Sequence, residues 1–577
     1  MNEELSNRRH SLAHLLAAAI LDLYPNTLLT LGPAVDNGFY YDVSPENPIT
    51  DKDLAKIEKK MKSILPSWGG FSHKEITPEE ARELFKENKF KLELIEEIIE
   101  RGEKITLYTA GEFTDLCRGG HIDEMSSIDP DSFSLDRVAG AYWRGDEKNP
   151  MLTRIYGLAF DTKEELEAYK TQREEAKERD HRKIGKELSL FTFSDLVGSG
   201  LPLFTPKGTA LRNAIISKIH EIQGAYGYQE VWIPHITKPD LYKTSGHWEK
   251  FGDELFKVKS RESEFVLKPM NCPHHTQIFD AEARSYKDLP LRFTEATAVY
   301  RDEQSGELLG LSRVRAITQD DGHVFCTEEQ IGQEIAIIAK VIKDFYTLLG
   351  MFKEGEYRVG LSVRDPKTPE KYLGEDSVWE NAEKSLEEAA QKEGFKYTRE
   401  EGEAAFYGPK LDFKFKDAIG REWQLATIQL DFNMPKRFGL SYTDKDGSKK
   451  IPVMIHRAIA GSLERFLSVI IEHYAGNFPF WMAPVQVQII PIAEAHGSEA
   501  NEVLQILKNN GIRAEVDASG DGFGKRVRKA KNNKIPYFII IGDKDIEVQK
   551  VTLESRDEGQ LGQLTIEEIV KRFSKEK

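Results

Sequence analysis

Arginines and carboxylates at short spacing mark residues 299–325 as a candidate anion-binding site. The segment, VYRDEQSGELLGLSRVRAITQDDGHVF, carries Arg301, Arg313 and Arg315 among apolar residues at strand-like intervals. Its QSGEL turn signal predicts two antiparallel strands joined by a loop of about ten residues, with the arginines on one face. An arginine fork matches phosphate and carboxylate geometry. A surface hairpin with solvated salt bridges would carry similar charges, but the terminal run at 319–323, QDDGH, favours a site.

Two pairs of side chains nearer the N-terminus have the spacing of a metal site or a hydrolytic site. His10 and His14 lie four residues apart, so a helix would place them on one face. Cys117 and His121 have the same spacing, across two glycines that allow a tight turn. The four side chains suit zinc by ligand type and equally suit a site that positions a water. For the histidine pair alone, a polar stripe on a half-buried helix is an equally good interpretation.

The composition of the chain limits the class of protein to which these candidate site residues can belong. The chain has 577 residues, 40% hydrophobic and 31% charged, which is typical of a soluble globular protein with several domains. Because the net charge is −16, contacts to nucleic acid must use local basic clusters. Three widely spaced cysteines favour a reducing, cytoplasmic location. No apolar run approaches the roughly 20 residues of a membrane helix, so we expect no membrane association.

Local patterns predict four parts of the chain. Residues 1–160 begin with an apolar helix and form the first domain, and residues 161–195 follow as a linker. The linker intersperses both charge signs at i,i+3 and i,i+4 spacing, which predicts a long solvated helix. Alternating apolar residues within 196–480 predict antiparallel strands. Residues 481–577 alternate strand, helix and strand, which predicts an α/β domain with a mixed, mostly parallel sheet.

The basic run Lys525–Lys534 is a local exception in an acidic chain. It holds six basic residues and no acid. A solvated helix face is the default interpretation, and contact with phosphate is the alternative.

Residues 299–325 resemble motif 2 of the class II aminoacyl-tRNA synthetases, in the form found in threonyl-tRNA synthetases, through Tyr300-Arg301-Asp302-Glu303. Residues 205–236 resemble motif 1, and Gly461-Ser462-Leu463-Glu464-Arg465 resembles motif 3. The HxxxH pair and the CxxxH pair resemble the editing site of that family. Residues 481–577 resemble its anticodon-binding domain.

The resemblance implies an α+β multidomain enzyme. Its catalytic core, at 196–480, would be a class II antiparallel β-sheet with flanking helices. An N-terminal α+β editing domain would occupy 1–160, and a C-terminal α/β anticodon-binding domain 481–577. Most bacterial members carry a further small N-terminal domain, which this sequence is expected to lack.

The implied activity is that of a threonine–tRNA ligase. Threonine is activated with ATP to threonyl-adenylate and transferred to the 3′ end of tRNA(Thr), and mischarged seryl-tRNA(Thr) is hydrolysed. Editing is needed because one methyl group gives only about 1–3 kcal/mol of discrimination. The implied partners are tRNA(Thr), ATP, L-threonine and a second copy in a homodimer formed through motif 1.

The resemblance also implies the residues of each site. Spacing alone would not propose zinc in the catalytic domain, but the resemblance assigns one Zn2+ per subunit to Cys272, His323 and His456. The implied threonine-binding residues are Gln319, Asp321 and Tyr407. The implied ATP-binding residues, with Mg2+, are Arg301, Glu303, Arg313, Lys410, Gln424, Ser462 and Arg465, of which Arg301 and Arg465 are catalytic. The implied editing residues are His10, His14, Lys91, Asp115, Cys117 and His121, without a metal.

Two rival interpretations remain at this level. One is a synthetase of neighbouring specificity, such as a prolyl or seryl enzyme, against which the Cys-His-His set argues. The other is a catalytically inactive paralogue that only binds RNA. Retention of Arg301, Glu303 and Arg465 argues against it.

Overall fold

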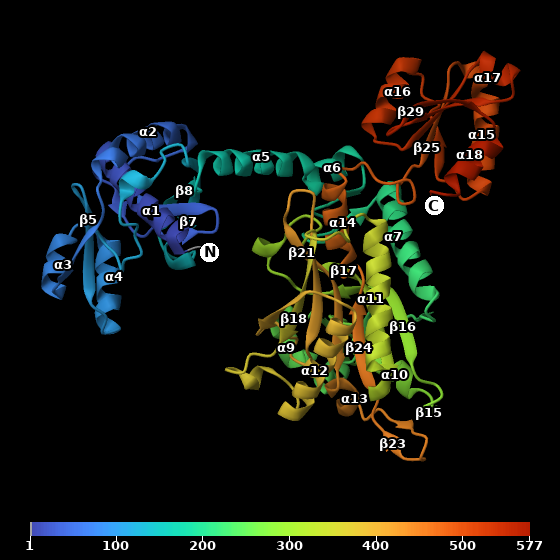
Figure 1. The fold of residues 1–577 in the computed structure, drawn as a ribbon, viewed down its shortest axis with the longest axis horizontal. Helices are drawn as coiled ribbons and strands as arrows, with labels where there is room; N and C mark the ends of the chain where they lie inside the picture. Colours follow the sequence, from blue (N-terminus) through green and yellow to red (C-terminus); the bar gives the residue numbers. More distant parts are fainter. Residues whose placement is uncertain (1–2, 577) are drawn as a thin grey trace. The chain divides into compact units, whose positions relative to one another are not determined.

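The computed structural model describes residues 3–576, which form two compact units that meet in sequence between Glu175 and Ala176. Figure 1 shows the course of the chain from the N-terminus to the C-terminus. None of the helices in residues 3–576 combines the length and the apolar character that crossing a membrane would require.

The N-terminal unit packs two helices on an antiparallel sheet. The strand order is β1-β3-β8-β7, with β2 paired to β3. Helix α1, Glu3–Leu23, is buried along Leu12–Ile20 against this sheet, which explains its long apolar run. A smaller sheet, β4-β5-β6, carries α3 and α4. The bounds are β1 Leu28–Leu29, β2 Ala34–Val35, β3 Gly38–Ser44, α2 Leu54–Ile64, β4 Ser72–Ile76, α3 Pro78–Leu84, α4 Lys89–Glu100, β5 Ile105–Ala110, β6 Phe113–Leu116, β7 Phe133–Tyr142 and β8 Met151–Ala159.

The predicted linker helix is two helices. Helix α5, Lys163–Arg179, ends before Asp180, and α6, His181–Glu187, follows at once. The Asp180 carboxylate accepts a hydrogen bond from the backbone N–H of Arg182 at 2.7 Å and so caps α6. The charge pattern predicted helix correctly but gave no sign of this break.

The second unit is built on a large sheet with the strand order β11-β16-β17-β24-β21-β20-β18-β19. The pairings from β16 to β18 are all antiparallel, as the sequence predicted, and only the two outermost pairs are parallel. The bounds are β11 Gln229–Glu230, β16 Leu291–Tyr300, β17 Ala316–Cys326, β18 Tyr357–Val363, β19 Tyr397–Glu401, β20 Lys410–Lys416, β21 Glu422–Asp431 and β24 Val453–Ala458.

The two faces of this sheet differ in chemistry. Alternate residues such as Val324, Ile428 and Ile455 lie in the apolar core with α7, α11, α12 and α14. Their neighbours in the strands, such as His323 and His456, point to the other face, because successive side chains alternate along a strand. Figure 1 shows α11 lying along these strands. The helix bounds are α7 Pro206–Gly224, α8 Pro239–Ser245, α9 His247–Phe251, α10 Cys272–Asp280, α11 Ile331–Leu348, α12 Asp376–Lys392, α13 Asn433–Arg437 and α14 Leu463–His473.

The hairpin of β16 and β17 differs from the predicted one in its connection. The residues between the strands are 301–315, longer than the expected loop, and Ser305–Glu307 form a short 3-10 helix within it. Arg301, Arg313 and Arg315 all lie in this connection rather than on one face of the strands. Leu311 and Val314 are apolar at strand-like intervals, which predicted a strand, but they are buried by packing of the loop.

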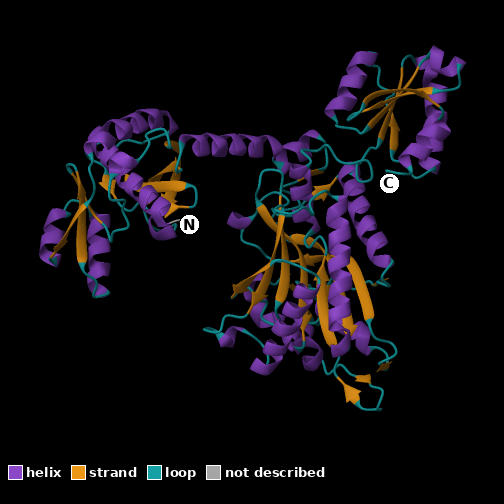
Figure 2. Ribbon diagram, viewed as in Figure 1, coloured by secondary structure: helices purple, strands orange, loops and turns teal. Residues whose placement is uncertain are grey.

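The C-terminal part has the strand order β26-β25-β27-β28-β29. Strand β25 is parallel to both neighbours, whereas β28 is antiparallel to β27 and to β29, so the sheet is mixed but not mostly parallel. Figure 2 shows helices flanking these strands. The bounds are β25 Val487–Pro491, α15 Gly497–Asn509, β26 Ala514–Val516, α16 Phe523–Asn532, β27 Tyr537–Ile541, α17 Asp543–Glu547, β28 Val551–Ser555, β29 Gly559–Leu564 and α18 Ile566–Phe573.

Candidate active site

Three residues far apart in sequence meet on the polar face of the large sheet. His323 on β17 pairs directly with His456 on β24, and their Nε2 and Nδ1 atoms lie 3.0 Å apart. Cys272 begins α10, and its thiol completes a buried group whose ligand atoms lie within 4.8 Å of one another. A thiol and two imidazoles are ligands that zinc prefers. The cross-strand register therefore brings together the set that spacing alone did not indicate.

The outward nitrogen of each histidine also has a partner. His456 Nε2 lies 3.0 Å from Asp431 Oδ2, and His323 Nδ1 lies 2.7 Å from His275 Nδ1. Metal-binding histidines usually donate from the ring nitrogen that does not bind the metal, and this fixes the ring. The arrangement thus fits a metal ion in the group, bound through His323 Nε2 and His456 Nδ1. The sequence analysis missed Asp431, although it ends a strand two residues before a helix.

The predicted threonine-binding residues line one cavity of about 320 Å³. Gln319 and Asp321 project from β17 beside His323, because residues at i and i+2 share a face. Tyr407 closes the cavity with its ring 5.0 Å from that of His456. Burial raises the pKa of Asp321, whose Oδ2 accepts a hydrogen bond from the Asn271 amide at 3.0 Å.

Arg301 points into the same cavity without an ion-pair partner among residues 3–576. Its guanidinium lies 4.9 Å above the Phe251 ring and its Nη2 lies 3.2 Å from Met270 Sδ, while its Nε has no hydrogen-bond partner. Burial lowers the pKa of Arg301 from its ordinary value, although an arginine stays charged near neutral pH. The charges of Glu254 and Glu303 offset this effect of burial only in part, so the geometry favours an anionic ligand beside the guanidinium.

Four more predicted ATP-binding residues, Glu303, Arg313, Ser462 and Arg465, line the same cavity. Arg313 forms an ion pair with Glu303, with an Nη2–Oε2 distance of 2.7 Å. In this structure each of the two side chains therefore neutralises the charge of the other. Ser462 caps α14 by accepting a hydrogen bond from the backbone of Arg465. Arg465 donates from Nε to the Ser312 carbonyl at 3.1 Å, and burial lowers its pKa.

Lys410 and Gln424 share a carboxylate that the sequence analysis did not single out. The buried Asp412 accepts hydrogen bonds from Lys410 Nζ at 2.8 Å and from Gln424 Nε2 at 2.6 Å. Gln424 lines the cavity, whereas Lys410 lies beside it. Leu425 is also a lining residue.

The N-terminal unit holds a second cluster in a separate cavity of about 490 Å³. Cys117 Sγ lies between two imidazoles, 3.1 Å from His10 Nε2 and 3.3 Å from His121 Nε2. The ring of His14 is 4.9 Å from each of these histidine rings. Gly119 and Gly120 have φ values of 103° and 83°, which confirms the glycine turn predicted beside Cys117. The four residues therefore meet, as their spacing allowed.

Burial keeps this cluster uncharged. It lowers the pKa of His10 and of His14, and it lowers the pKa of His121 to about 3 with a further contribution from the other two histidines. Burial also raises the pKa of the Cys117 thiol. Neutral imidazoles beside a neutral thiol can accept a hydrogen bond from a water molecule and so orient it near neutral pH.

A buried ion pair between Lys91 and Asp115 lies beside His14 of this Cys-His cluster. Lys91 Nζ lies 2.5 Å from Asp115 Oδ1, and Tyr41 donates to Asp115 Oδ2 at 2.5 Å. Asp115 Oδ2 is also 3.5 Å from His14 Nδ1. Both predicted residues thus contact the cluster or its support, and Tyr41 is a member that the sequence analysis did not name.

Three protein-family models match three separate segments of the chain. Residues 256–474 match a tRNA synthetase class II core domain (G, H, P, S and T), and residues 486–576 match an anticodon binding domain. Residues 105–156 match the threonyl and alanyl tRNA synthetase second additional domain.

Individual relatives match over nearly the whole chain. A threonine–tRNA ligase of Rubrobacter xylanophilus is 47% identical, covering 96% of this chain and 85% of the relative. One from Thermosynechococcus vestitus is 46% identical, covering 99% of this chain and 95% of the relative. Among solved structures, the RNA binding domain of threonyl-tRNA synthetase from Cryptosporidium parvum is 37% identical with a TM-score of 0.66, covering 69% of this chain and 98% of that one.

Proposed function

The chain belongs to the threonine–tRNA ligases, a family of class II aminoacyl-tRNA synthetases, and from that premise we propose how its residues carry out the reaction. The observation that carries the proposal is the single cavity in which an unpaired Arg301 faces the residues around the Cys-His-His group. Arg301 would bind phosphate, and the residues around the Cys-His-His group would bind a small amino acid.

The first step is in-line attack of the threonine carboxylate on the α-phosphate of ATP, which gives threonyl-adenylate and pyrophosphate. Arg301 contacts the α-phosphate and the amino-acid carboxylate, and Arg465 binds on the γ-phosphate side. Glu303 and Arg313 would separate from one another to hold adenine and the triphosphate, which would bind as its Mg2+ complex. Catalysis is then positioning and charge stabilisation, without a protein nucleophile.

Cys272, His323 and His456 would hold one zinc ion per subunit. When bound, the ion supplies a Lewis acid that can take the amino group and the hydroxyl of threonine. Asp321 accepts a hydrogen bond from one of these groups, and Gln319 and Tyr407 enclose the side chain. Valine lacks the hydroxyl and would leave polar groups unpaired, so the site rejects it.

The cluster of the N-terminal unit would hydrolyse mischarged seryl-tRNA. The raised pKa of Cys117 disfavours a thiolate nucleophile, so we propose that water attacks the ester. A neutral histidine accepts the proton of the water, and Cys117 helps to position the substrate. Lys91 and Asp115 hold the pocket in shape.

We propose the same four-part division as before: editing at 1–160, a linker at 161–195, catalysis at 196–480 and anticodon binding at 481–577. The partners are tRNA(Thr) and a second copy of the chain, which would pack on the motif 1 segment, where Trp232 and Ile236 expose apolar surface. Three free cysteines favour the cytoplasm.

A pair of histidine variants tests the catalytic proposal. His456→Ala removes a proposed zinc ligand, and His73→Ala removes an exposed histidine of strand β4 that does not line the cavity. We expect His456→Ala to lose bound zinc and threonine-dependent ATP–pyrophosphate exchange, while His73→Ala keeps both. Metal analysis and the exchange assay give the result, and full exchange by His456→Ala without zinc would contradict the proposed zinc role.

A further inference from the structure

Helix α6 contacts the ATP-binding connection between β16 and β17 through one side chain. The backbone N–H of Leu311 donates a hydrogen bond to His181 Nε2 at 3.0 Å, and both residues are buried. His181 stands at the first position of α6, in the segment that links the two halves of the chain. Neither the motifs nor the proposed sites account for this histidine.

The hydrogen-bond partners of His181 fix its tautomer. A backbone N–H can only donate, so Nε2 must accept and the ring proton must lie on Nδ1. Nδ1 lies 2.7 Å from Glu472 Oε1 on α14, so it donates there. The same carboxylate oxygen accepts from the backbone N–H of His181 at 3.1 Å. The ring is therefore held between α14 and the connection, with both nitrogens in use.

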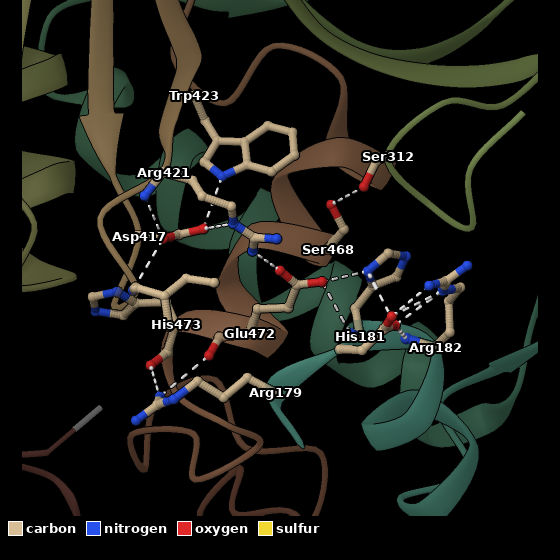
Figure 3. Close-up of polar contacts among 12 residues, drawn as sticks. Arg179, His181, Arg182, Ser312, Asp417, Arg421, Trp423, Ser468, Glu472 and His473 are labelled. Carbon is tan, nitrogen blue, oxygen red and sulfur yellow. Dashed lines mark hydrogen bonds and ion pairs between the residues drawn. The ribbon is translucent and has the colours of Figure 1, made fainter. Parts of the chain in front are cut away.

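A charge network that extends from buried Asp417 to the exposed side chain of Arg421 holds Glu472 in place. Arg421 pairs with the other oxygen of Glu472 and also donates from Nε to Asp417 Oδ2 at 2.7 Å. Burial alone would raise the pKa of Glu472, but the hydrogen bonds from His181 and the charge of Arg421 hold it below its ordinary value. Figure 3 shows His181 and Arg421 reaching Glu472 from opposite sides. An ionised Glu472 keeps the proton on Nδ1 and leaves Nε2 as the acceptor.

The backbone of the connection approaches His181 closely. Gly310, next to Leu311, has a φ of 50°, and a Cβ built on it would lie 2.3 Å from His181 Nε2. Any larger residue would push the ring away from the Leu311 N–H. The contact between His181 and the Leu311 N–H therefore depends on glycine at position 310.

The fixed residue is adjacent to those that line the cavity. Ser312 and Arg313, the next two residues, are both cavity-lining. Ser312 donates from Oγ to Ser468 Oγ at 2.9 Å, and its carbonyl accepts from Arg465. Displacement of Leu311 would therefore move Arg313 and the Arg465 contact together.

A metal role for this histidine does not fit. Asp180, His181 and Glu472 lie close enough to resemble a metal site. However, the two carboxylates are paired with Arg182 and Arg421, and the imidazole nitrogens are already hydrogen-bonded. Both ring nitrogens are therefore occupied and each carboxylate is already neutralised by an arginine, which does not favour a cation here.

We propose that His181 is a positioning residue for ATP binding, because it holds residues 310–313 in the conformation that presents Arg313 and the Arg465 contact to the triphosphate. The proposal rests on the ATP-binding role proposed above for these arginines. It connects the linker helix α6 to the nucleotide subsite through a single acceptor nitrogen.

Two substitutions separate the contacts of the ring in the full-length enzyme. The amide of His181→Asn reaches only the Nδ1 position, so it can donate to Glu472 but leaves Leu311 N–H without a partner. The carbonyl of His181→Gln reaches the Nε2 position and can accept from Leu311. Lys183→Asn is the control, because Lys183 is an exposed residue of the same helix that pairs with Glu178.

Threonine-dependent ATP–pyrophosphate exchange gives the KM for each substrate. We expect His181→Asn to raise the KM for ATP about tenfold and the KM for threonine less than about twofold, since one buried backbone donor is left unpaired. His181→Gln should restore most of the ATP affinity, and Lys183→Asn should match the parent enzyme. Equal KM values for ATP in the Asn and Gln variants, or an equal rise for both substrates, would overturn the proposal.

If His181→Asn lowers the stability of the enzyme, amide hydrogen exchange still tests the proposal. In the folded fraction, amides of residues 305–315 should exchange faster in His181→Asn than in His181→Gln, and equal protection would also overturn the proposal. Absence of threonine-dependent exchange in the parent enzyme would instead contradict the proposed function.

Discussion

At the scale of single residues, both sites depend on buried polar side chains with defined partners. His456 and His323 each place one nitrogen in the Cys-His-His group and the other against Asp431 or His275. In the N-terminal unit, Asp115 has the equivalent supporting role, because it accepts from Tyr41 and pairs with Lys91. In both sites a carboxylate outside the cluster lies against one of its histidines, Asp431 beside His456 and Asp115 beside His14.

Substitution of Cys117 should separate editing from charging. We expect Cys117→Ala to keep threonylation within about twofold, because the cysteine lies in the other compact unit from the ATP cavity. Hydrolysis of seryl-tRNA(Thr) should fall by roughly tenfold or more, since the sulfur that lies between His10 and His121 is lost. The measurement is deacylation of preformed seryl-tRNA. Unchanged hydrolysis would show that the editing assignment is wrong.

The buried histidines make the stability of the N-terminal unit depend on pH. The pKa values of His10, His14 and His121 are lowered in the folded state relative to about 6.5 in the unfolded chain. Below pH 6.5 the unfolded chain binds more protons, so the free energy of unfolding decreases as the pH falls toward 3. Their stabilising contribution is fully present only above about pH 7.

A histidine variant tests this dependence on pH. The urea midpoint of the transition that includes the N-terminal unit should decrease between pH 7.5 and pH 5.5. His14→Gln, which removes one titrating group, should decrease less over the same interval. A parent midpoint that rises on acidification would contradict the inferred protonation states.

At the scale of elements, a buried ion pair joins the strands that carry the site. Arg457 on β24 donates to Asp320 on β17 at 2.6 Å, and its guanidinium also reaches Gln223 on α7 and Thr294 on β16. Asp320 in turn accepts from the backbone N–H of Ile459 and of Ala460. The pair therefore sets the register that places His323 opposite His456.

Removal of this arginine should be costly. Arg457→Met leaves the Asp320 charge buried and uncompensated, so we expect the free energy of unfolding of the catalytic unit to fall by about 3–5 kcal/mol. Arg358→Met is the matched control. Arg358 lies in a more exposed pair with Glu400, worth about 1 kcal/mol or less. Denaturant unfolding of both variants gives the comparison, and equal losses would contradict the structural role of the buried pair.

Much of the architecture could be predicted from sequence because it is local. Alternation predicted the antiparallel strands, and the position of two glycines predicted the turn beside Cys117. The hairpin was predicted, but its arginines were placed on strands, because burial of Leu311 and Val314 in a loop looks the same in sequence as burial in a strand. The break at Asp180 was missed, since charge alternation continues across it.

The candidate sites were predictable to a smaller extent. Resemblance to a family pointed to Cys272, His323 and His456, but their meeting depends on pairing of β17 with β24, which spacing does not encode. Asp412 and Asp431 were missed because a single carboxylate, whether inside a strand or at its end, has no distinctive pattern. Only the tertiary structure shows that these carboxylates hold Lys410 and His456.

At the scale of the whole molecule, two cavities with opposite tasks occur in separate compact units. One cavity has an unpaired arginine and a Cys-His-His group, which suits synthesis of an adenylate. The other has neutral imidazoles around a thiol, which suits hydrolysis. A site that accepts threonine through its hydroxyl discriminates poorly against serine, so the second activity follows from the chemistry of the first.

Amino-acid-dependent ATP–pyrophosphate exchange by the purified full-length enzyme tests the central claim most directly. The account predicts exchange with threonine, a rate with serine that is lower by roughly 10- to 200-fold, and no detectable exchange with valine or proline. Exchange with proline but not with threonine, or exchange with valine as readily as with threonine, would contradict it.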